Sequence, residues 1–271
     1  RDRDVTGVQT CALPISTMNM TGKKALILGI ANKHSIAYGI ARALKAQGVE
    51  LAISYAGAAL AKRVHPIAEE LGVDQVFECD LSKDNDIKNM ISILAEEWDS
   101  IDYIVHSVAY APISDLNLPF QHISRHGFLT AMDISVYSLI AVVREAEMLL
   151  KPGSSVITMT YYGAQKVVPN YGVMGIAKAA LEASVRYLAH SMGEKGVRVN
   201  AISAGPIRTL SSAAIGGVAQ LQRRIEKLAP LARNIEQEDI AKTALYLLSD
   251  LASGVTGDVL FVDSGISIMA Y

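Results

Sequence analysis

The feature that most constrains this chain is an alternation, from Lys23 onward, of short apolar runs of β type with longer runs whose apolar residues recur at helical spacing. Such an alternation is typical of a parallel sheet with helices on both faces. We predict seven strands, each mostly apolar on both faces and therefore buried. They are residues 25–29, 51–55, 75–79, 103–107, 155–160, 198–202 and 259–262.

The segments between these runs carry apolar stripes of helical period. Ile36, Ile40 and Leu44 share one helix face, and Gly48 is predicted to end that helix. No repeat or long linker divides the chain after residue 20. The sequence therefore predicts one α/β domain over residues 18–271, with a Rossmann-type, doubly wound, seven-stranded parallel sheet.

The composition excludes several classes of protein. The chain has 271 residues, of which 51% are hydrophobic and 19% charged, with a formal net charge of -2. A near-neutral chain without a run of like charges offers no surface for nucleic acid. No uninterrupted apolar stretch reaches the roughly 18 residues of a membrane helix, so we expect no membrane insertion. Cys11 and Cys79 have no metal-type spacing and fit a cytoplasmic protein, with Cys79 buried in a strand.

Two segments differ from the rest of the chain. Residues 1–17 show no period, and residues 5–16 resemble a translated sequencing-adapter read. We expect a non-native or disordered leader there and exclude it from the fold. Residues 208–230 begin with small residues and continue as an amphipathic piece, which suggests a lid over a pocket.

The loop after the first predicted strand has the setting of a phosphate-binding loop. Residues 29–39 lead from the strand directly into a helix, where backbone N–H groups can face a pyrophosphate. Gly29 permits a tight exit from the strand, and Ser35 is suited to cap the helix. The loop lacks the pattern G-x-G-x-x-G, so an ordinary strand-to-helix turn explains it about equally well.

The ends of the next two strands bear on the choice of dinucleotide. A base at the end of the second strand would meet the 2′-phosphate of NADPH, but none follows Tyr55 directly, and Lys62 and Arg63 lie farther along. We therefore expect NADH rather than NADPH. Asp80 follows the third strand, where it could cap the next helix or accept a hydrogen bond from an adenine.

Tyr171 and Lys178 form the most informative pair. Their spacing makes nearly two helical turns, so both side chains are predicted on one face of a helix. A free tyrosine has a pKa of about 10, and a neighbouring ammonium would favour the phenolate and ease proton transfer. Taken alone, such a pair on an amphipathic helix is usually a coincidence.

Four blocks of sequence resemble, in order, the enoyl-acyl-carrier-protein reductase family. They are residues 29–39, 106–112 (HSVAYAP), 171–178 (YGVMGIAK) and 198–210 (RVNAISAGPIRTL). This family belongs to the short-chain dehydrogenase/reductase superfamily but has Tyr-x6-Lys in place of Tyr-x3-Lys. The resemblance implies a dinucleotide-binding catalytic domain that uses NADH to reduce the 2,3 double bond of trans-2-enoyl thioesters, carried by acyl carrier protein in fatty acid biosynthesis.

The resemblance also implies roles for individual residues. Tyr171 would donate a hydrogen bond to the thioester carbonyl and stabilise an enolate, and Lys178 would hold the nicotinamide ribose. Tyr161 matches a second active-site tyrosine, and Ala111 would line the acyl pocket with both tyrosines. The implied cofactor contacts are Gly29, Ser35 and Ile36 at the diphosphate, Asp80 and Leu81 at the adenine, Val108 beside the nicotinamide ribose, and Ile207, Arg208, Thr209, Leu210 and Ser211 over the nicotinamide.

The chain departs from the commoner family pattern in two places. Ala56 stands where a polar side chain often follows the second strand, and Ala109-Tyr110 replaces Gly-Phe. The six histidines have no metal-type pairing and no partnered Ser or Cys, so we predict structural or surface roles and no metal site.

Two other functions compete with this prediction. A carbonyl reductase of the superfamily would carry Tyr-x3-Lys with an upstream Ser, whereas here Gly175 and Tyr161 occupy those two positions. A catalytically dead homologue acting as a scaffold would have lost Tyr171 or Lys178, and both are present.

The superfamily resemblance further implies a homotetramer. Its subunits would pack through the helices around residues 131–150 and 171–192, and the apolar residues 266–271 could join that interface.

Overall fold

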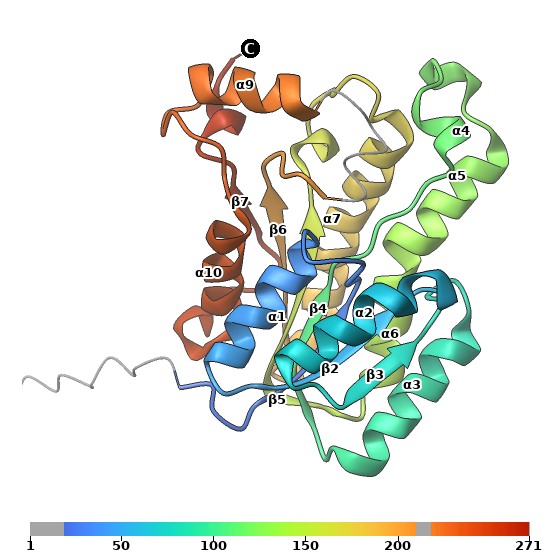
Figure 1. Ribbon diagram of the computed structural model, residues 1–271, viewed down its shortest axis with the longest axis vertical. Coiled ribbons are helices and arrows are strands. Elements are labelled where there is room, and N and C mark those ends of the chain that lie inside the picture. Colours follow the sequence, from blue (N-terminus) through green and yellow to red (C-terminus); the bar gives the residue numbers. More distant parts are fainter. Residues whose placement is uncertain (1–18, 210–217, 271) are drawn as a thin grey trace, which may run out of the picture.

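The computed structural model describes residues 19–209 and 218–270 of the chain. They contain a seven-stranded, all-parallel sheet in the order β3-β2-β1-β4-β5-β6-β7 (Figure 1). The strands are β1 (Lys24–Leu28), β2 (Glu50–Tyr55), β3 (Gln75–Glu78), β4 (Ile101–His106), β5 (Leu150–Thr160), β6 (Arg198–Ala204) and β7 (Val259–Val262). The predicted number of strands and the doubly wound topology are confirmed. The predicted leader lies outside the described residues.

Helices cover both faces of the sheet (Figure 1). One face packs against α1 (Ile36–Ala46), α2 (Ala58–Leu71) and α10 (Gln237–Leu248). The other packs against α3 (Asp84–Glu97), α6 (Ser138–Ala146) and α7 (Gly172–Gly193). The apolar stripe predicted for α1 is buried at Ile40 and Leu44, while Lys45 faces water. The two apolar clusters therefore form a core on each side of the sheet.

Shorter elements surround the carboxyl ends of the strands. They are α4 (Ile113–Leu116), η1 (Phe120–His122), α5 (Arg125–Met132), the π-helix η2 (Asp133–Tyr137), η3 (Tyr162–Ala164), α9 (Val218–Leu228) and η5 (Ile266–Ile268). The short η4 (Asp250–Ala252) instead follows α10 at the amino edge of the sheet. Helices α5, η2 and α6 run on continuously over Arg125–Ala146, which is long and apolar enough to cross a membrane by length and composition alone. Its most apolar window is 50% buried, and it packs against α3 and α7. The segment is thus a core helix of this fold.

Two strand predictions need correction. The prediction that all seven strands are buried is wrong for β3 and β7, whose residues remain partly or fully exposed. Both strands lie at the edges of the sheet and have one neighbour each, so their faces are incompletely covered. Strand β5 also begins at Leu150, five residues before the predicted start at residue 155. The prediction missed these residues because Pro152 and Gly153 interrupt the apolar pattern. In the structure, a register shift between Ile101 and Tyr103 of β4 accommodates them.

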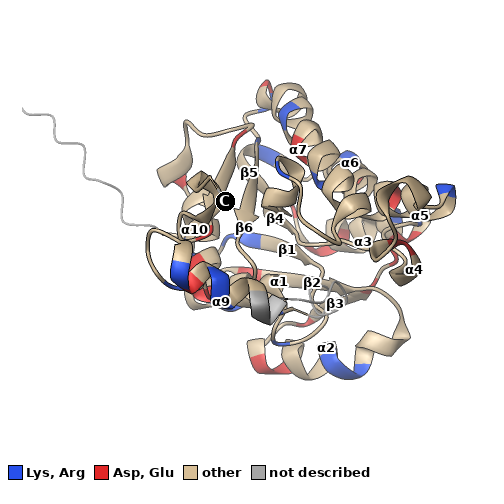
Figure 2. Ribbon diagram, turned by 90° about the horizontal axis from the view of Figure 1, so that it is seen from above, with Lys and Arg blue, Asp and Glu red and all other residues tan. Residues whose placement is uncertain are grey.

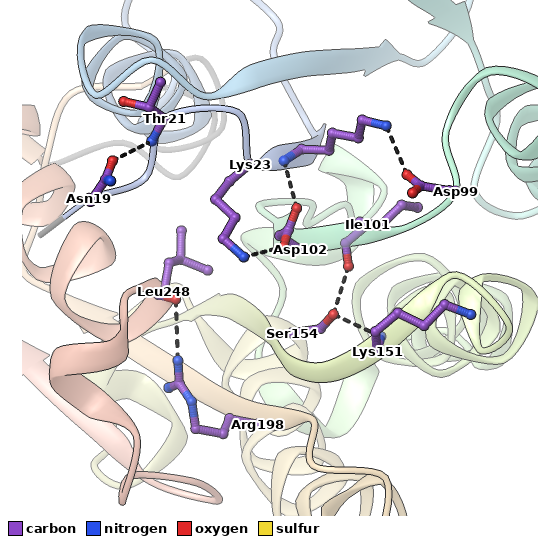
Figure 3. A network of polar contacts seen from close by, with 11 residues as sticks. Asn19, Thr21, Lys23, Asp99, Ile101, Asp102, Lys151, Ser154, Arg198 and Leu248 are labelled. Atoms are coloured by element: carbon purple, nitrogen blue, oxygen red, sulfur yellow. Dashed lines mark hydrogen bonds and ion pairs between the residues drawn. The ribbon is translucent and has the colours of Figure 1, made fainter.

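The amino ends of the strands are joined by polar contacts (Figure 3). Asp102 accepts hydrogen bonds from the Lys23 ammonium and from the backbone N–H of Lys24, both at 2.9 Å. Ser154 of β5 donates to the Ile101 carbonyl at 2.8 Å, and Arg198 of β6 donates to carbonyls at the end of α10. These contacts tie neighbouring elements together at this edge, and the predicted site residues gather at the opposite edge.

Candidate active site

The predicted site residues converge at the carboxyl edge of the sheet. Gly29 follows β1, Val108 follows β4, Tyr161 follows β5 and Ile207 follows β6. The chain reverses its direction of winding between β1 and β4, which are neighbours in the sheet. In open α/β sheets, ligands bind outside the carboxyl ends of the strands at such a switch point.

The exit from β1 depends on glycine. Gly29 has φ +100°, and a Cβ atom there would lie 2.1 Å from the backbone oxygen of Ser107. The backbone N–H of Ser107 in turn donates to the Leu28 carbonyl at 3.0 Å. The predicted tight exit is thus a close approach of two chain segments, and any side chain would prevent it.

Ser35 occupies the predicted N-cap position of α1, but its side chain does not cap the helix. The hydroxyl instead accepts hydrogen bonds from the backbone N–H groups of Ala31 at 3.0 Å and Asn32 at 3.1 Å. The prediction that the Ser35 side chain caps α1 is therefore wrong, because the preceding loop folds back and its N–H groups bind the hydroxyl instead. The N–H groups of the first turn of α1 keep the orientation that suits an anion.

Asp80 does not cap the helix that follows it. Helix α3 starts at Asp84 with Lys83 in the N-cap position. The Asp80 carboxylate instead accepts hydrogen bonds from the backbone N–H of Ser82 at 3.1 Å and its hydroxyl at 2.7 Å, and it forms an ion pair with Lys83 at 3.2 Å. Of the two alternatives for Asp80, capping is excluded, because α3 begins farther along the chain.

Tyr161 and Tyr171 lie against each other. Their ring centroids are 5.0 Å apart and their planes meet at 77°, an edge-to-face arrangement. Tyr161 follows β5, and Tyr171 occupies the N-cap position of α7. Residues ten apart in sequence are therefore joined at one point of the sheet edge.

The direction predicted for the pKa shift of Tyr171 is wrong. Burial raises the pKa of Tyr171 well above its ordinary value, and the neighbouring Tyr161 raises it further. Burial likewise raises the pKa of Tyr161 to about 12. Desolvation dominates over the attraction of the Lys178 ammonium that the spacing suggested, so both phenols are neutral near pH 7.

Lys178 lies on α7 and is buried, at 5% exposure. Its ammonium donates to the backbone oxygen of Met159 at 2.8 Å. Burial lowers the pKa of Lys178 from 10.5 to about 8, while the negative charge of Glu182 opposes this shift. Only one of its three N–H groups has an acceptor among the residues that the structure describes. The ammonium is thus fixed by one hydrogen bond, and its other N–H groups can donate to a ligand.

The other predicted contacts are placed as follows. Leu81 and Ala111 are buried, Ile36 and Val108 are half-buried, and Ile207 and Thr209 are half-buried on the segment after β6. Arg208 is exposed and donates to Gln222 of α9 at 3.1 Å. Leu210 and Ser211 lie outside the described residues, as do all of residues 210–217 of the predicted lid.

Other residues of the site escaped the sequence analysis. A Cβ atom on Gly163 would lie 2.5 Å from the Tyr171 ring, and one on Gly175 would lie 2.9 Å from the Gly163 backbone oxygen. Thr160 donates to the buried Glu182 carboxylate at 2.9 Å. A charged residue four positions after Lys178 was a usable signal for Glu182, whereas the glycine contacts connect elements that no local pattern relates.

The histidine at the end of β4 is part of the core. His106 is fully buried between Thr158 at 3.0 Å and Ser138 at 2.8 Å. Burial lowers the pKa of His106 from 6.5 to about 3. Within residues 19–209 and 218–270, no cluster of three His, Cys, Asp or Glu side chains is arranged to hold a metal ion. Cys79 is buried as a free thiol, as predicted.

Known proteins resemble this chain over most of its length. A sequence profile described as enoyl-(acyl carrier protein) reductase matches residues 29–267. The enoyl-acyl-carrier-protein reductase (NADH) 1 of Rhizobium meliloti is 50% identical over 246 residues, which cover 91% of this chain and 90% of that protein.

Solved structures resemble it equally well. A Bacillus cereus enoyl-acyl carrier protein reductase with NADP+ and indole naphthyridinone has a TM-score of 0.91 at 45% identity, covering 93% of this chain and 99% of that one. An Anaplasma phagocytophilum reductase in complex with NAD has a TM-score of 0.88 at 45% identity, covering 94% and 96%. The chain belongs to the enoyl-(acyl carrier protein) reductase family.

Proposed function

We propose that this chain reduces the 2,3 double bond of trans-2-enoyl thioesters with NADH. The observation that carries the proposal is the ring contact of Tyr161 with Tyr171 at the carboxyl end of β5, where the buried Lys178 ammonium donates to Met159 of the same strand. Two neutral phenols and a buried ammonium supply hydrogen-bond donors, which suit a substrate carbonyl that gains negative charge during reduction.

The residues present fit a dinucleotide. Because Gly29 has no side chain, a diphosphate can come close to the backbone beside the start of α1, where N–H groups can bind it. The Lys178 donors that have no acceptor within residues 19–209 and 218–270 match ribose hydroxyls, and Ile207 and Thr209 lie on the segment that would cover the nicotinamide. When bound, NADH supplies the hydride for the β-carbon of the substrate, and a proton from solvent then completes the reduction at the α-carbon.

The protein's own groups act on the thioester. In this proposal the neutral Tyr171 hydroxyl donates to the carbonyl oxygen and stabilises the enolate that forms, since its raised pKa keeps the proton in place. Tyr161 holds the ring of Tyr171 from the side and completes the acyl pocket with Ala111. Lys178 positions the cofactor from beneath.

The end of β2 supports the choice of NADH. Tyr55 is buried and is followed by Gly57 at φ +77°, and its hydroxyl lies 3.4 Å from the His65 ring nitrogen. Lys62 and Arg63 belong to exposed turns of α2. A 2′-phosphate would therefore meet no base directly after the strand. The relative from Rhizobium meliloti is likewise named for NADH.

We infer that the thioester is carried by acyl carrier protein, in keeping with the names of the relatives. A homotetramer in the cytoplasm is also proposed, and exposed apolar side chains on helices of the predicted interface support it, among them Leu129 at 58% and Tyr187 at 78% exposure. Both acidic and basic residues occur on α2 and on α9 (Figure 2), and the formal net charge of the chain is -2, which disfavours nucleic acid as a partner.

The proposal is tested by following the oxidation of the reduced dinucleotide through the loss of its absorbance. The purified protein is given NADH with a trans-2-enoyl thioester, then NADH with a 3-ketoacyl thioester, then NADPH with the enoyl thioester. We expect turnover in the first case and less in the third. Turnover of the ketoacyl substrate alone would instead identify a carbonyl reductase, and no turnover with any substrate would favour a binding protein.

A further inference from the structure

Beneath the proposed active site lies a buried carboxylate that the proposed reaction does not use. Glu182 lies one turn after Lys178 on α7 and is 6% exposed. One carboxylate oxygen accepts the Thr160 hydroxyl at 2.9 Å, and the other accepts the Gln165 amide at 3.3 Å. Its neighbours at the end of β5 and after η3 thus both donate to it.

These contacts connect Glu182 with both sides of the site. Thr160 is the last residue of β5 and directly precedes Tyr161, so its hydroxyl anchors the strand end from which that tyrosine projects. Met159, the residue before Thr160, accepts the hydrogen bond of Lys178. Two successive residues of β5 are therefore pinned to two successive turns of α7, one through a cation and one through an anion.

Charge balance gives the carboxylate a second effect. Burial disfavours the charged form of Lys178, and Glu182 is the group whose charge opposes that penalty. Another titratable group that interacts with the ammonium is His106 on β4, which is neutral because its pKa is lowered to about 3. The phenols Tyr161 and Tyr171 at the same edge of the sheet have raised pKa values and are neutral as well. None of these supplies negative charge near neutral pH.

We propose that Glu182 is a positioning residue of the reaction, which keeps Lys178 in its charged, cofactor-binding form and fixes Tyr161 through Thr160. The role of Glu182 in fixing Tyr161 rests on the proposed function. The role of Glu182 in keeping Lys178 charged concerns dinucleotide binding alone, so it can be tested without turnover.

Two substitutions separate the two effects. Glu182→Gln keeps the shape but removes the charge, and Thr160→Val keeps the charge but removes the hydrogen bond. Glu238→Gln and Thr243→Val on α10 are matched controls, since Glu238 pairs with Lys242 at the surface and Thr243 donates within its own helix. Circular dichroism and thermal melts establish that each variant folds.

NADH affinity is measured by fluorescence titration between about pH 6.5 and about pH 9.5. In the wild type we expect affinity to fall as pH rises through about 8, where Lys178 loses its proton. Glu182→Gln should move that fall to lower pH, by about one pH unit. Thr160→Val should leave the midpoint unchanged while lowering kcat for the enoyl thioester about tenfold.

The outcomes are distinct. A Glu182→Gln profile that superimposes on the wild type overturns the inference, as does wild-type kcat in Thr160→Val. Glu182→Asp, which keeps the charge on a shorter side chain, should show the wild-type pH midpoint but a lower kcat. If Glu182→Gln does not fold, Glu182→Met, which also lacks the charge, replaces it and should show the same shift of the midpoint. A wild type without enoyl turnover but with the shifted Glu182→Gln profile rejects the proposed function and keeps the role of Glu182 at Lys178.

Discussion

The Tyr161 ring meets the Tyr171 ring edge to face, with centroids 5.0 Å apart, and Gly163 lies against both rings. The orientation of the proposed hydrogen-bond donor is thus set by a second aromatic ring and by the lack of a side chain beside it. Aromatic contacts of this kind stabilise by about 0.5–1.5 kcal/mol beyond their buried area.

Removing the Tyr171 hydroxyl should impair turnover without unfolding the protein. Tyr171→Phe keeps the ring contact but removes the donor, so we expect kcat for the enoyl thioester to fall about 10²- to 10³-fold with little change in Tm. Steady-state kinetics and a thermal melt provide the measurement. Wild-type kcat in the variant would show that the carbonyl is polarised by another group.

The contact of Gly163 with the tyrosines predicts a second loss. In Gly163→Ala the new Cβ would lie 2.5 Å from a Tyr171 ring carbon and 3.3 Å from Tyr161, so the rings must shift and kcat should fall by about tenfold or more. Gly193→Ala at the end of α7 is the control, because its Cβ would meet no atom within 4 Å. Equal kcat values for the two variants would show that turnover does not depend on the exact positions of the two rings.

The close approach of β1 and β4 predicts a large stability loss. Gly29→Ala places a Cβ 2.1 Å from the Ser107 oxygen at φ +100°, so we expect the free energy of unfolding to fall by more than about 2 kcal/mol. Gly22→Ala has a similar positive φ of +76° but open space around the Cβ, and it should cost about 1 kcal/mol. Urea denaturation of both variants measures the difference, and equal losses would mean that backbone strain alone matters.

Burial of His106 predicts a dependence of stability on acid. Because the pKa of His106 is lowered from 6.5 to about 3, the unfolded chain binds more protons than the folded protein between these values. The free energy of unfolding should therefore fall as pH decreases below about 6.5, by up to a few kcal/mol from this group.

His106→Gln isolates that contribution from the carboxylates that also titrate in acid. The variant should be less stable than the wild type at about pH 7, by about 1 kcal/mol for the weakened hydrogen bonds, and it should lose less stability on acidification to about pH 4.5. Urea denaturation at both pH values measures this. Parallel losses in the two proteins would place the acid sensitivity elsewhere.

The sequence by itself determined the number and approximate bounds of the strands, because buried parallel strands are continuous apolar runs that can be found locally. It also predicted Tyr171 and Lys178 as site residues, since they match a motif whose spacing is a property of the chain. Gly29 was identified for the right reason, although its partner Ser107 was not.

Only the tertiary structure decided how these groups behave. Desolvation, which depends on what covers a side chain, raised the pKa of Tyr171 against the expected effect of Lys178. The same packing turned the Ser35 hydroxyl toward its own loop and left β3 exposed at the sheet edge. Contacts between distant elements, such as that of Thr160 with Glu182, have no period in the sequence, because the fold alone brings their partners together.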